Sequence, residues 1–179
     1  MTEQIITWTT TPIIDGLALV AASPQGLCAV RLGQTTPELV AALQKLFPAA
    51  QLVQNETLLL KTAANLVADL VGGIPHSEVS HLELDVQGTI FQQEVWLALR
   101  AIPAGETRSY QQIAKSLGRP RAMQAVGQAC AQNPLPIIIP CHRVVGTDGS
   151  LHGYIYGWGR KQQLLGAEAR ALGKAGYQV

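Results

Sequence analysis

The chain has little charge, few aromatic rings and few cysteines for its length. Of its 179 residues, 14% are charged, 5% are aromatic and three are cysteine, whereas 47% are hydrophobic. This balance excludes a disordered, collagen-like or coiled-coil protein. No uninterrupted apolar run approaches the ~18 residues that a membrane span needs. At roughly 100–200 residues per domain, the length predicts one globular domain or two small ones.

The cysteines Cys28, Cys130 and Cys141 are odd in number and widely spaced. Such a set is typical of free thiols in a reducing compartment and not of a disulfide framework. Residues 1–4 carry no basic group ahead of the first short apolar stretch, so we expect no signal peptide. The sequence therefore predicts an intracellular protein, cytoplasmic in a bacterium or nuclear in a eukaryote.

Charge is divided unevenly along the chain. Residues 1–90 carry three basic and eight acidic side chains, whereas residues 91–179 carry ten basic and four acidic ones. A basic half is typical of a protein region that meets an anion, most commonly nucleic acid. Attraction between the two halves is the alternative interpretation.

The first half alternates between strand and helix signals. Turn-forming residues separate several β-prone stretches, and the apolar spacing of two other stretches is helical. We expect strands at 4–10, 17–22, 27–32 and 81–86, a turn at Pro12, and helices at 37–46 and 58–70. His76 and His81, even with Cys28, lack the paired spacing of zinc ligands, so no metal site is expected.

The second half is mostly helical. Thr89 and Gln92 form a capping-box pattern that opens a helix through Arg100, and Ser109 is placed to cap a second helix at 110–117. After a turn at 118–120, a third helix is expected at 121–132. Two short helices across a glycine-containing turn are typical of a helix-turn-helix, whose second helix enters the DNA major groove.

The third helix has two distinct faces. Its apolar positions, expected to pack inward, are Ala122, Val126, Ala129 and Cys130. Its long polar positions are Arg121, Gln124, Gln128 and Gln132. The small residues Ala125 and Gly127 leave room for the backbone of a nucleic acid. An ordinary solvated helix surface would show the same pattern.

A cysteine and a histidine follow an isoleucine run. Residues 137–139 resemble a buried strand that leads to Cys141 and His142, with Pro140 fixing the backbone between them. Cysteine reacts as a thiolate, which a nearby histidine favours. Adjacent side chains on an extended segment point to opposite sides, so we expect a water molecule to bridge the two. Alternatively, Cys141 is a small buried hydrophobe.

Glu168 lies within the apolar stripe of a predicted helix at 161–172, formed with Leu164, Leu165, Ala171 and Leu172. A buried carboxylate is costly unless it is paired. His142 is the expected partner, because an acid orients the base in nucleophile–base–acid sites. Alternatively, Glu168 reaches solvent at the helix end. The loop at 149–159, rich in glycine and aromatic residues, suits a pocket for a planar ligand such as a flipped base, although its rings would also serve simple packing.

Residues 88–172 resemble the O⁶-alkylguanine-DNA alkyltransferases (methylated-DNA–protein-cysteine methyltransferases). The central match is Pro140-Cys141-His142-Arg143-Val144. Further matches, in order, are Phe91-Gln92, Val95-Trp96, Ile102-Pro103, Gly105, Thr107, Ser109-Tyr110, Ala125-Val126-Gly127, Asn133-Pro134, Gly153-Tyr154, Lys161, Leu164-Leu165 and Glu168. Residues 1–87 are similar only in size, strand content and the turn at Gly26-Leu27.

The resemblance implies a ribonuclease-H-like α/β domain with a small antiparallel sheet at 1–87. It implies a mainly helical, winged-helix-like domain with a helix-turn-helix at 88–179, which contacts the DNA minor groove. Cys141 would take the alkyl group from O⁶ of a flipped guanine, or from O⁴ of thymine. His142 would accept the thiol proton through water, and Glu168 would hold His142. The stable thioether implies one repair per molecule and no cofactor.

The remaining roles also follow from the resemblance. Tyr110 would help to rotate the nucleotide and would donate a hydrogen bond to guanine, Tyr154 would support the leaving group, and Asn133 would shape the turn before the active-site strand. The expected DNA contacts are Ser109, Tyr110, Arg121, Gln124, Ala125, Gly127 and Gln128. The expected pocket residues are Pro136, Val144, Tyr154, Ile155 and Tyr156. A monomer is expected, with cooperative binding on DNA left open.

Three departures from the family pattern stand out. Gln124 occupies the place of an arginine that fills the gap left by the flipped base, and Arg121 is a candidate substitute. Ile155 replaces a small or polar residue, which bears on the size of alkyl group accepted. The zinc cluster of some members has no counterpart. The alternatives are a lesion-binding sensor without transfer, a helix-turn-helix regulator that senses alkylation, and a Cys-His hydrolase.

Overall fold

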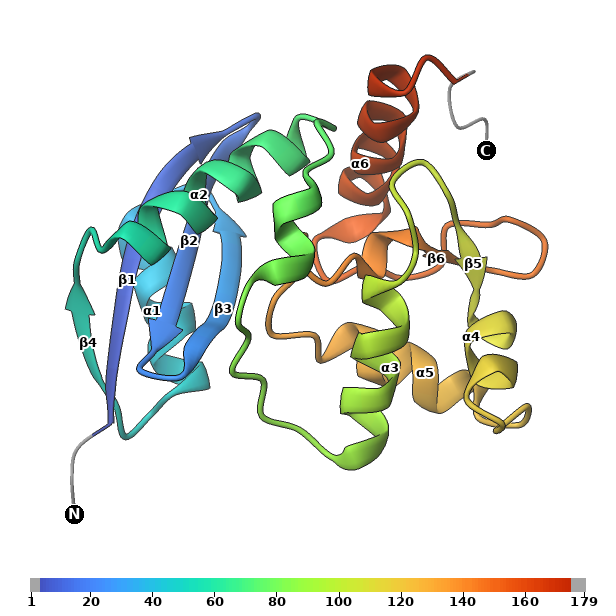
Figure 1. Ribbon diagram of the computed structural model, residues 1–179, viewed down its shortest axis with the longest axis horizontal. Coiled ribbons are helices and arrows are strands. Elements are labelled where there is room, and N and C mark those ends of the chain that lie inside the picture. Colours follow the sequence, from blue (N-terminus) through green and yellow to red (C-terminus); the bar gives the residue numbers. More distant parts are fainter. Residues whose placement is uncertain (1–3, 175–179) are drawn as a thin grey trace. The chain divides into compact units, whose positions relative to one another are not determined.

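The computed structural model describes residues 4–174, which form two compact units (Figure 1). The first unit contains the described residues up to Gly72 together with His76–Val86. The second contains Gly73–Pro75 together with the described residues from Gln87 onward. No helix within residues 4–174 is long and apolar enough to cross a membrane.

The first unit is built on a four-stranded mixed sheet in the order β3-β2-β1-β4. The strands are β1 (Ile5–Ile13), β2 (Gly16–Ser23), β3 (Gly26–Gly33) and β4 (Gln51–Gln54). The three strands expected before residue 33 are confirmed, but β1 runs through Pro12, which pairs with Leu17 instead of ending the strand. Because β4 runs parallel to β1, the sheet is mixed, and the antiparallel sheet implied by the resemblance is wrong. The short β4 segment has no alternating pattern that would have revealed it.

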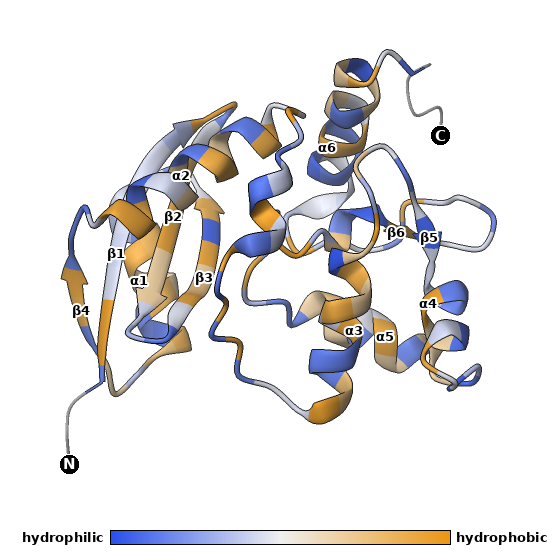
Figure 2. Cartoon of the chain, viewed as in Figure 1, coloured by the Kyte–Doolittle hydropathy of each residue, from blue (hydrophilic) through white to orange (hydrophobic). Residues whose placement is uncertain are grey.

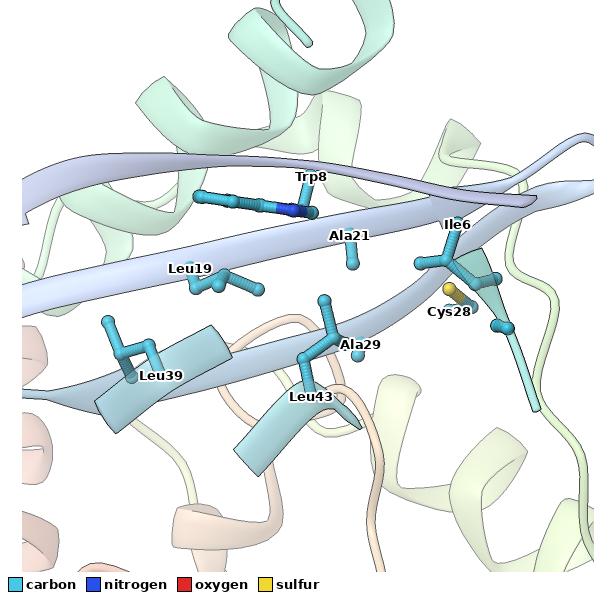
Figure 3. Close-up of a cluster of buried hydrophobic side chains, with 9 residues drawn as sticks. Ile6, Trp8, Leu19, Ala21, Cys28, Ala29, Leu39 and Leu43 are labelled. Carbon is cyan, nitrogen blue, oxygen red and sulfur yellow. The ribbon is translucent and has the colours of Figure 1, made fainter. Parts of the chain in front are cut away.

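Two helices cover opposite faces of this sheet (Figure 1). They are α1 (Thr36–Leu46) and α2 (Leu58–Val71), each capped by a threonine side chain, and both match the prediction. Hydrophobic and hydrophilic residues alternate in bands along α2 (Figure 2). On the α1 face, Leu39 and Leu43 pack with Trp8 and Leu19 of the sheet (Figure 3).

The strand predicted at 81–86 is wrong. Ser77–His81 forms a short 3-10 helix (η1), and the following segment makes a single parallel bridge between Leu84 and Leu27. Only one pair of backbone hydrogen bonds joins this segment to the edge of the sheet, from Leu27 N to the Glu83 carbonyl and from Asp85 N to the Leu27 carbonyl.

The second unit is mainly helical. Its helices are α3 (Ile90–Arg100), α4 (Tyr110–Ser116), α5 (Met123–Ala131) and α6 (Gly157–Ala171). The predicted capping box of Thr89 with Gln92 is present, and Ser109 caps α4 as predicted, where it also forms a capping box with Gln112. Two-residue strands, β5 (Arg108–Ser109) and β6 (Val144–Val145), pair in parallel. This pairing brings the start of α4 beside the chain that follows Cys141.

Candidate active site

Cys141 lies on a short 3-10 helix, η2 (Cys141–Arg143), and not beside an extended strand. The preceding isoleucines form a buried turn, because Ile137 has a φ of 78° and Ile139 N donates to the Leu135 carbonyl at 2.8 Å. The predicted strand at 137–139 is therefore wrong. A run of apolar residues indicates burial, but by itself it does not separate a strand from a turn.

Asn133 holds this turn together and contacts the sulfur. Its Nδ2 atom donates to the Ile139 carbonyl at 2.8 Å and to Cys141 Sγ at 3.2 Å, while its Oδ1 atom accepts from Leu135 N at 2.9 Å. Burial raises the pKa of Cys141 to about 11, although the Asn133 hydrogen bond acts in the opposite direction. At neutral pH the resting side chain is therefore a thiol, and it needs a base before it can react.

Glu168 is buried on α6 and is paired, as the sequence predicts. Its Oε1 atom lies 2.7 Å from His142 Nε2 and 2.9 Å from Arg143 Nη2, and its Oε2 atom accepts from Gly105 N at 3.0 Å. Burial opposes ionisation of Glu168, but the hydrogen bonds from His142 and Arg143 outweigh it and lower the pKa to about 2. Glu168 is thus a carboxylate at all ordinary pH values.

His142 is buried and has one free ring nitrogen. Burial lowers its pKa despite the Glu168 hydrogen bond, so the ring is neutral. Because Glu168 is an ionised acceptor, the proton belongs on Nε2, which leaves Nδ1 as a lone-pair acceptor. This buried Nδ1 has no hydrogen-bond partner among the described residues. His142 is therefore a neutral base, and its contact with Glu168 through Nε2 fixes the orientation of the ring.

A cavity of about 580 Å³ opens beside Cys141. Its lining residues are Tyr110, Gln111, Met123, Gly127, Cys130, Ala131, Cys141, Gly146, Thr147, His152, Gly153, Tyr154 and Ile155. Tyr154 has a buried hydroxyl without a partner among the described residues, and burial raises its pKa well above 10. The site therefore offers a thiol, a neutral hydroxyl donor and a mostly apolar wall to one ligand.

Several residues singled out from the sequence are placed differently. Pro136 and Val144 are buried outside the cavity wall, and Tyr156 packs edge-on against Tyr154 with ring centroids 5.8 Å apart. Ser109 is also buried, and its hydroxyl accepts from Gln112 N at 3.0 Å to cap α4. The hydroxyl of Ser109 is therefore engaged within the protein, and its contact with DNA stays a prediction. Leu172, expected in the inner stripe of α6, is exposed.

Three of the residues expected on the polar face of the third helix are exposed, namely Arg121, Gln124 and Gln128. The small residues Ala125 and Gly127 are half-buried. Val126, Ala129 and Cys130 face inward as predicted. Within residues 4–174, no three His, Cys, Asp or Glu side chains gather as metal ligands would.

Two buried charged side chains, which match the family pattern, were given no role from the sequence. Arg143 donates from Nη1 to the Ile102 carbonyl at 2.6 Å as well as pairing with Glu168. Lys161 is fully buried near Tyr110. Lys161 precedes Leu164 and Leu165 by three and four positions, so the periodicity that identified Glu168 also places this lysine on the inner face of α6.

Comparison with known proteins agrees with this geometry. Residues 90–170 match the family model for the 6-O-methylguanine DNA methyltransferase DNA-binding domain. The chain is 48% identical to the bifunctional transcriptional activator/DNA repair enzyme Ada of Escherichia coli over 86% of its own length, but it spans only 43% of Ada. It is 46% identical to a methylated-DNA–protein-cysteine methyltransferase of Methanosarcina barkeri, covering 69% of this chain and 76% of that protein.

Solved structures show the same fold. A crystal structure of Mycobacterium tuberculosis O6-methylguanine methyltransferase aligns with a TM-score of 0.73 at 34% identity, covering 93% of this chain and 94% of that one. A structure of Mycobacterium tuberculosis OGT in complex with DNA aligns with a TM-score of 0.71 over the same shares of the two chains. The chain belongs to the methylated-DNA–protein-cysteine methyltransferase family.

Proposed function

We propose that the protein repairs alkylated DNA directly, by moving the alkyl group from O⁶ of guanine, and from O⁴ of thymine, to Cys141. The observation that carries this proposal is a buried thiol on the wall of a cavity of about 580 Å³, next to a neutral histidine whose Nδ1 atom is free. The family of the chain and the DNA complex of a neighbour support it.

The first step is removal of the thiol proton. A water molecule would carry the proton from Cys141 Sγ to His142 Nδ1, which forms an imidazolium. Glu168 stabilises that imidazolium through the 2.7 Å contact with Nε2, and Arg143 keeps Glu168 ionised. The hydrogen bond from Asn133 then stabilises the thiolate. With these residues around it, the buried thiol becomes reactive only when His142 accepts its proton.

In the transfer step, the thiolate attacks the alkyl carbon. The S–C bond forms as the C–O⁶ bond breaks, and the bonding electron pair stays on the guanine oxygen. The neutral hydroxyl of Tyr154 donates a hydrogen bond to this guanine oxygen, and the hydroxyl of Tyr110 donates one to the guanine ring. Burial raises the pKa of Tyr110 to about 12, which keeps its hydroxyl protonated. The product thioether is stable, so each molecule repairs one lesion without a cofactor.

DNA is the macromolecular partner in this proposal. The α4–turn–α5 segment acts as a helix-turn-helix of the winged-helix type and lies in the minor groove, with Arg121, Gln124 and Gln128 toward the duplex. A Cβ atom at Gly127 would meet only the Tyr110 ring, at 3.9 Å, so packing within the protein does not require a glycine there. Its smallness instead suits the approach of a flipped nucleotide. Gln124 fills the gap in the duplex by hydrogen bonding, without the charge of an arginine.

We assign residues 1–87 to a ribonuclease-H-like domain and residues 88–179 to a catalytic domain; the compact units divide nearby, between Val86 and Gln87, although Gly73–Pro75 groups with the second unit. We expect the protein to act as a monomer in the bacterial cytoplasm.

Ile155 lines the cavity, so its size limits which alkyl groups fit beside Cys141.

Intact-protein mass after incubation with an O⁶-methylguanine duplex tests the function. We expect one added methyl group per chain, mapped to the peptide that contains Cys141. Cys141→Ala should bind the duplex and gain no mass. Cys130→Ala is the matched control, because Cys130 is a second buried thiol on the same cavity, and it should gain the methyl group as the wild type does. Tight lesion binding by the wild type without a mass change would instead indicate a damage sensor.

A further inference from the structure

Lys161 is the most completely buried charged side chain among the described residues, with 0% exposure. Its Nζ atom donates to the His152 carbonyl at 3.0 Å and lies 5.8 Å from the centre of the Tyr110 ring. Neither partner carries a negative charge, and no carboxylate within residues 4–174 forms an ion pair with it. A buried cation without an anionic partner is costly to folding. Its presence therefore calls for a physical reason.

The charges of the active site are otherwise balanced. Arg143 is matched by Glu168, and His142 is neutral in the resting state. Lys161 alone is left without a counter-charge in this part of the second unit. The titratable groups that face it are Tyr110 from α4, Cys130 from α5, and Cys141 and His142 from η2, all uncharged at neutral pH; the Lys161 charge lowers the pKa of both thiols and also that of His142.

We propose that Lys161 supplies the positive charge that stabilises the Cys141 thiolate during alkyl transfer, an inference that rests on the proposed function. Lys161 acts on Cys141 through space, since its two contacts, Tyr110 and the His152 carbonyl, belong to residues that line the same cavity as Cys141. The thiol proton still passes to His142, so Lys161 remains protonated throughout. When the proton has moved, the imidazolium is paired with Glu168 and the thiolate with Lys161, so each new charge has a counter-charge.

The electrostatic coupling agrees with this assignment. Burial lowers the pKa of Lys161, whereas negative charge on Cys130 or Cys141 raises it, so the ammonium and a thiolate favour each other. The same charge acts on both thiols, but only Cys141 receives a hydrogen bond from Asn133 and adjoins His142. Cys130 therefore stays a thiol, because burial raises its pKa and no side-chain hydrogen bond lowers it as the one from Asn133 does for Cys141.

The test measures the reactivity of Cys141 with iodoacetamide as a function of pH, followed by the mass of the Cys141 peptide, in full-length protein without DNA. Lys161→Gln keeps an N–H donor for the His152 carbonyl but removes the charge. In this variant, we expect the pH at which Cys141 reacts at half its maximal rate to rise by about one unit. At a fixed pH below that midpoint, the reaction would be ~10-fold slower. Lys161→Arg, which keeps the charge, should retain the wild-type profile. Lys45→Gln, which removes an exposed charge from α1, is the control and should change nothing.

Thermal unfolding separates this role from a structural one. Because the buried charge has no anionic partner among the described residues, the unfolding temperature of Lys161→Gln should equal or exceed that of the wild type. A lowered unfolding temperature with an unchanged pH profile would overturn the proposal. If the Gln variant does not fold, Lys161→Met replaces it, with the same expected shift in pH. Since the assay uses no DNA, a wild type that takes no methyl group from DNA would refute the proposed repair activity without deciding the role of Lys161.

Discussion

The two units bury different kinds of side chain. Among the described residues, the buried polar groups of the first unit are the hydroxyls of Thr9 and Ser23. Those of the second unit are Ser109, Asn133, His142, Arg143, Lys161 and Glu168. The first unit is thus held together by apolar packing, whereas the second buries two cations, an anion and a neutral base. Such a set is costly unless its members satisfy one another, and its concentration around one thiol marks that unit as the place of the chemistry.

The largest effect that we expect comes from Glu168→Ala in the second unit. This change leaves Arg143 and His142 buried without their shared anion, and breaking such a buried network costs about 3–5 kcal/mol of unfolding free energy. Methyl transfer to Cys141 should also be lost, because nothing then orients the His142 ring or stabilises its protonated form. Chemical denaturation together with the mass assay checks both. Normal transfer by the folded variant would show that His142 works without Glu168.

Leu43→Ala makes the matching change in the first unit. Leu43 has 0% exposure within the α1 core, and truncation of a buried leucine costs about 2–5 kcal/mol. Folded molecules of this variant should take up the methyl group at the wild-type rate, because no residue of the active site is changed. Transfer measured well below the unfolding temperature checks this. If the rate of methyl transfer falls in proportion to the loss of stability in both Glu168→Ala and Leu43→Ala, the two units do not differ in their importance for the reaction.

Acid should affect the stability of the second unit through Glu168. Its pKa is about 2 in the folded protein, against 4.5 for the free side chain. A lowered folded-state pKa gives stability that is fully present above pH 4.5 and is lost as the pH falls toward 2. The difference corresponds to roughly 3 kcal/mol. Denaturation at several pH values should show this loss in the wild type, and Glu168→Gln should show a smaller one. If the unfolding free energies of the two proteins fall equally with pH, groups other than Glu168 cause the acid sensitivity.

The same contrast separates what the sequence could predict from what it could not. Helices with clear apolar spacing or a capping box, such as α2 and α3, were predicted within one or two residues because those signals are local. The pairing of Glu168 with His142 was also predictable, since a carboxylate inside an apolar stripe needs a partner. The turn at Ile137 and the edge strand β4 were not predictable, because tertiary hydrogen bonds decide them. The role of Arg143 was not predictable, because its position in the sequence carries no signal that the side chain is buried against Glu168 and the Ile102 carbonyl.

The smallest effect that we expect separates stability from function at one glycine of the second unit. Gly127 lies inside α5, where alanine is the better helix former by about 1 kcal/mol, and the added methyl group would make only an ordinary contact with Tyr110. Gly127→Ala should therefore raise the unfolding free energy. Because Gly127 lines the cavity, the same methyl group should slow transfer from an O⁶-methylguanine duplex while leaving the reaction of Cys141 with iodoacetamide unchanged.

Gly166→Ala in α6 is the matched control for this effect. It replaces another glycine inside a helix, away from the cavity wall, where the nearest obstacle is the flexible end of Arg170. It should gain similar stability and transfer the methyl group normally. If both alanine variants transfer equally well, Gly127 is not needed for access of the base. If only Gly127→Ala is slow, the glycine holds open the approach to Cys141 at the expense of helix stability.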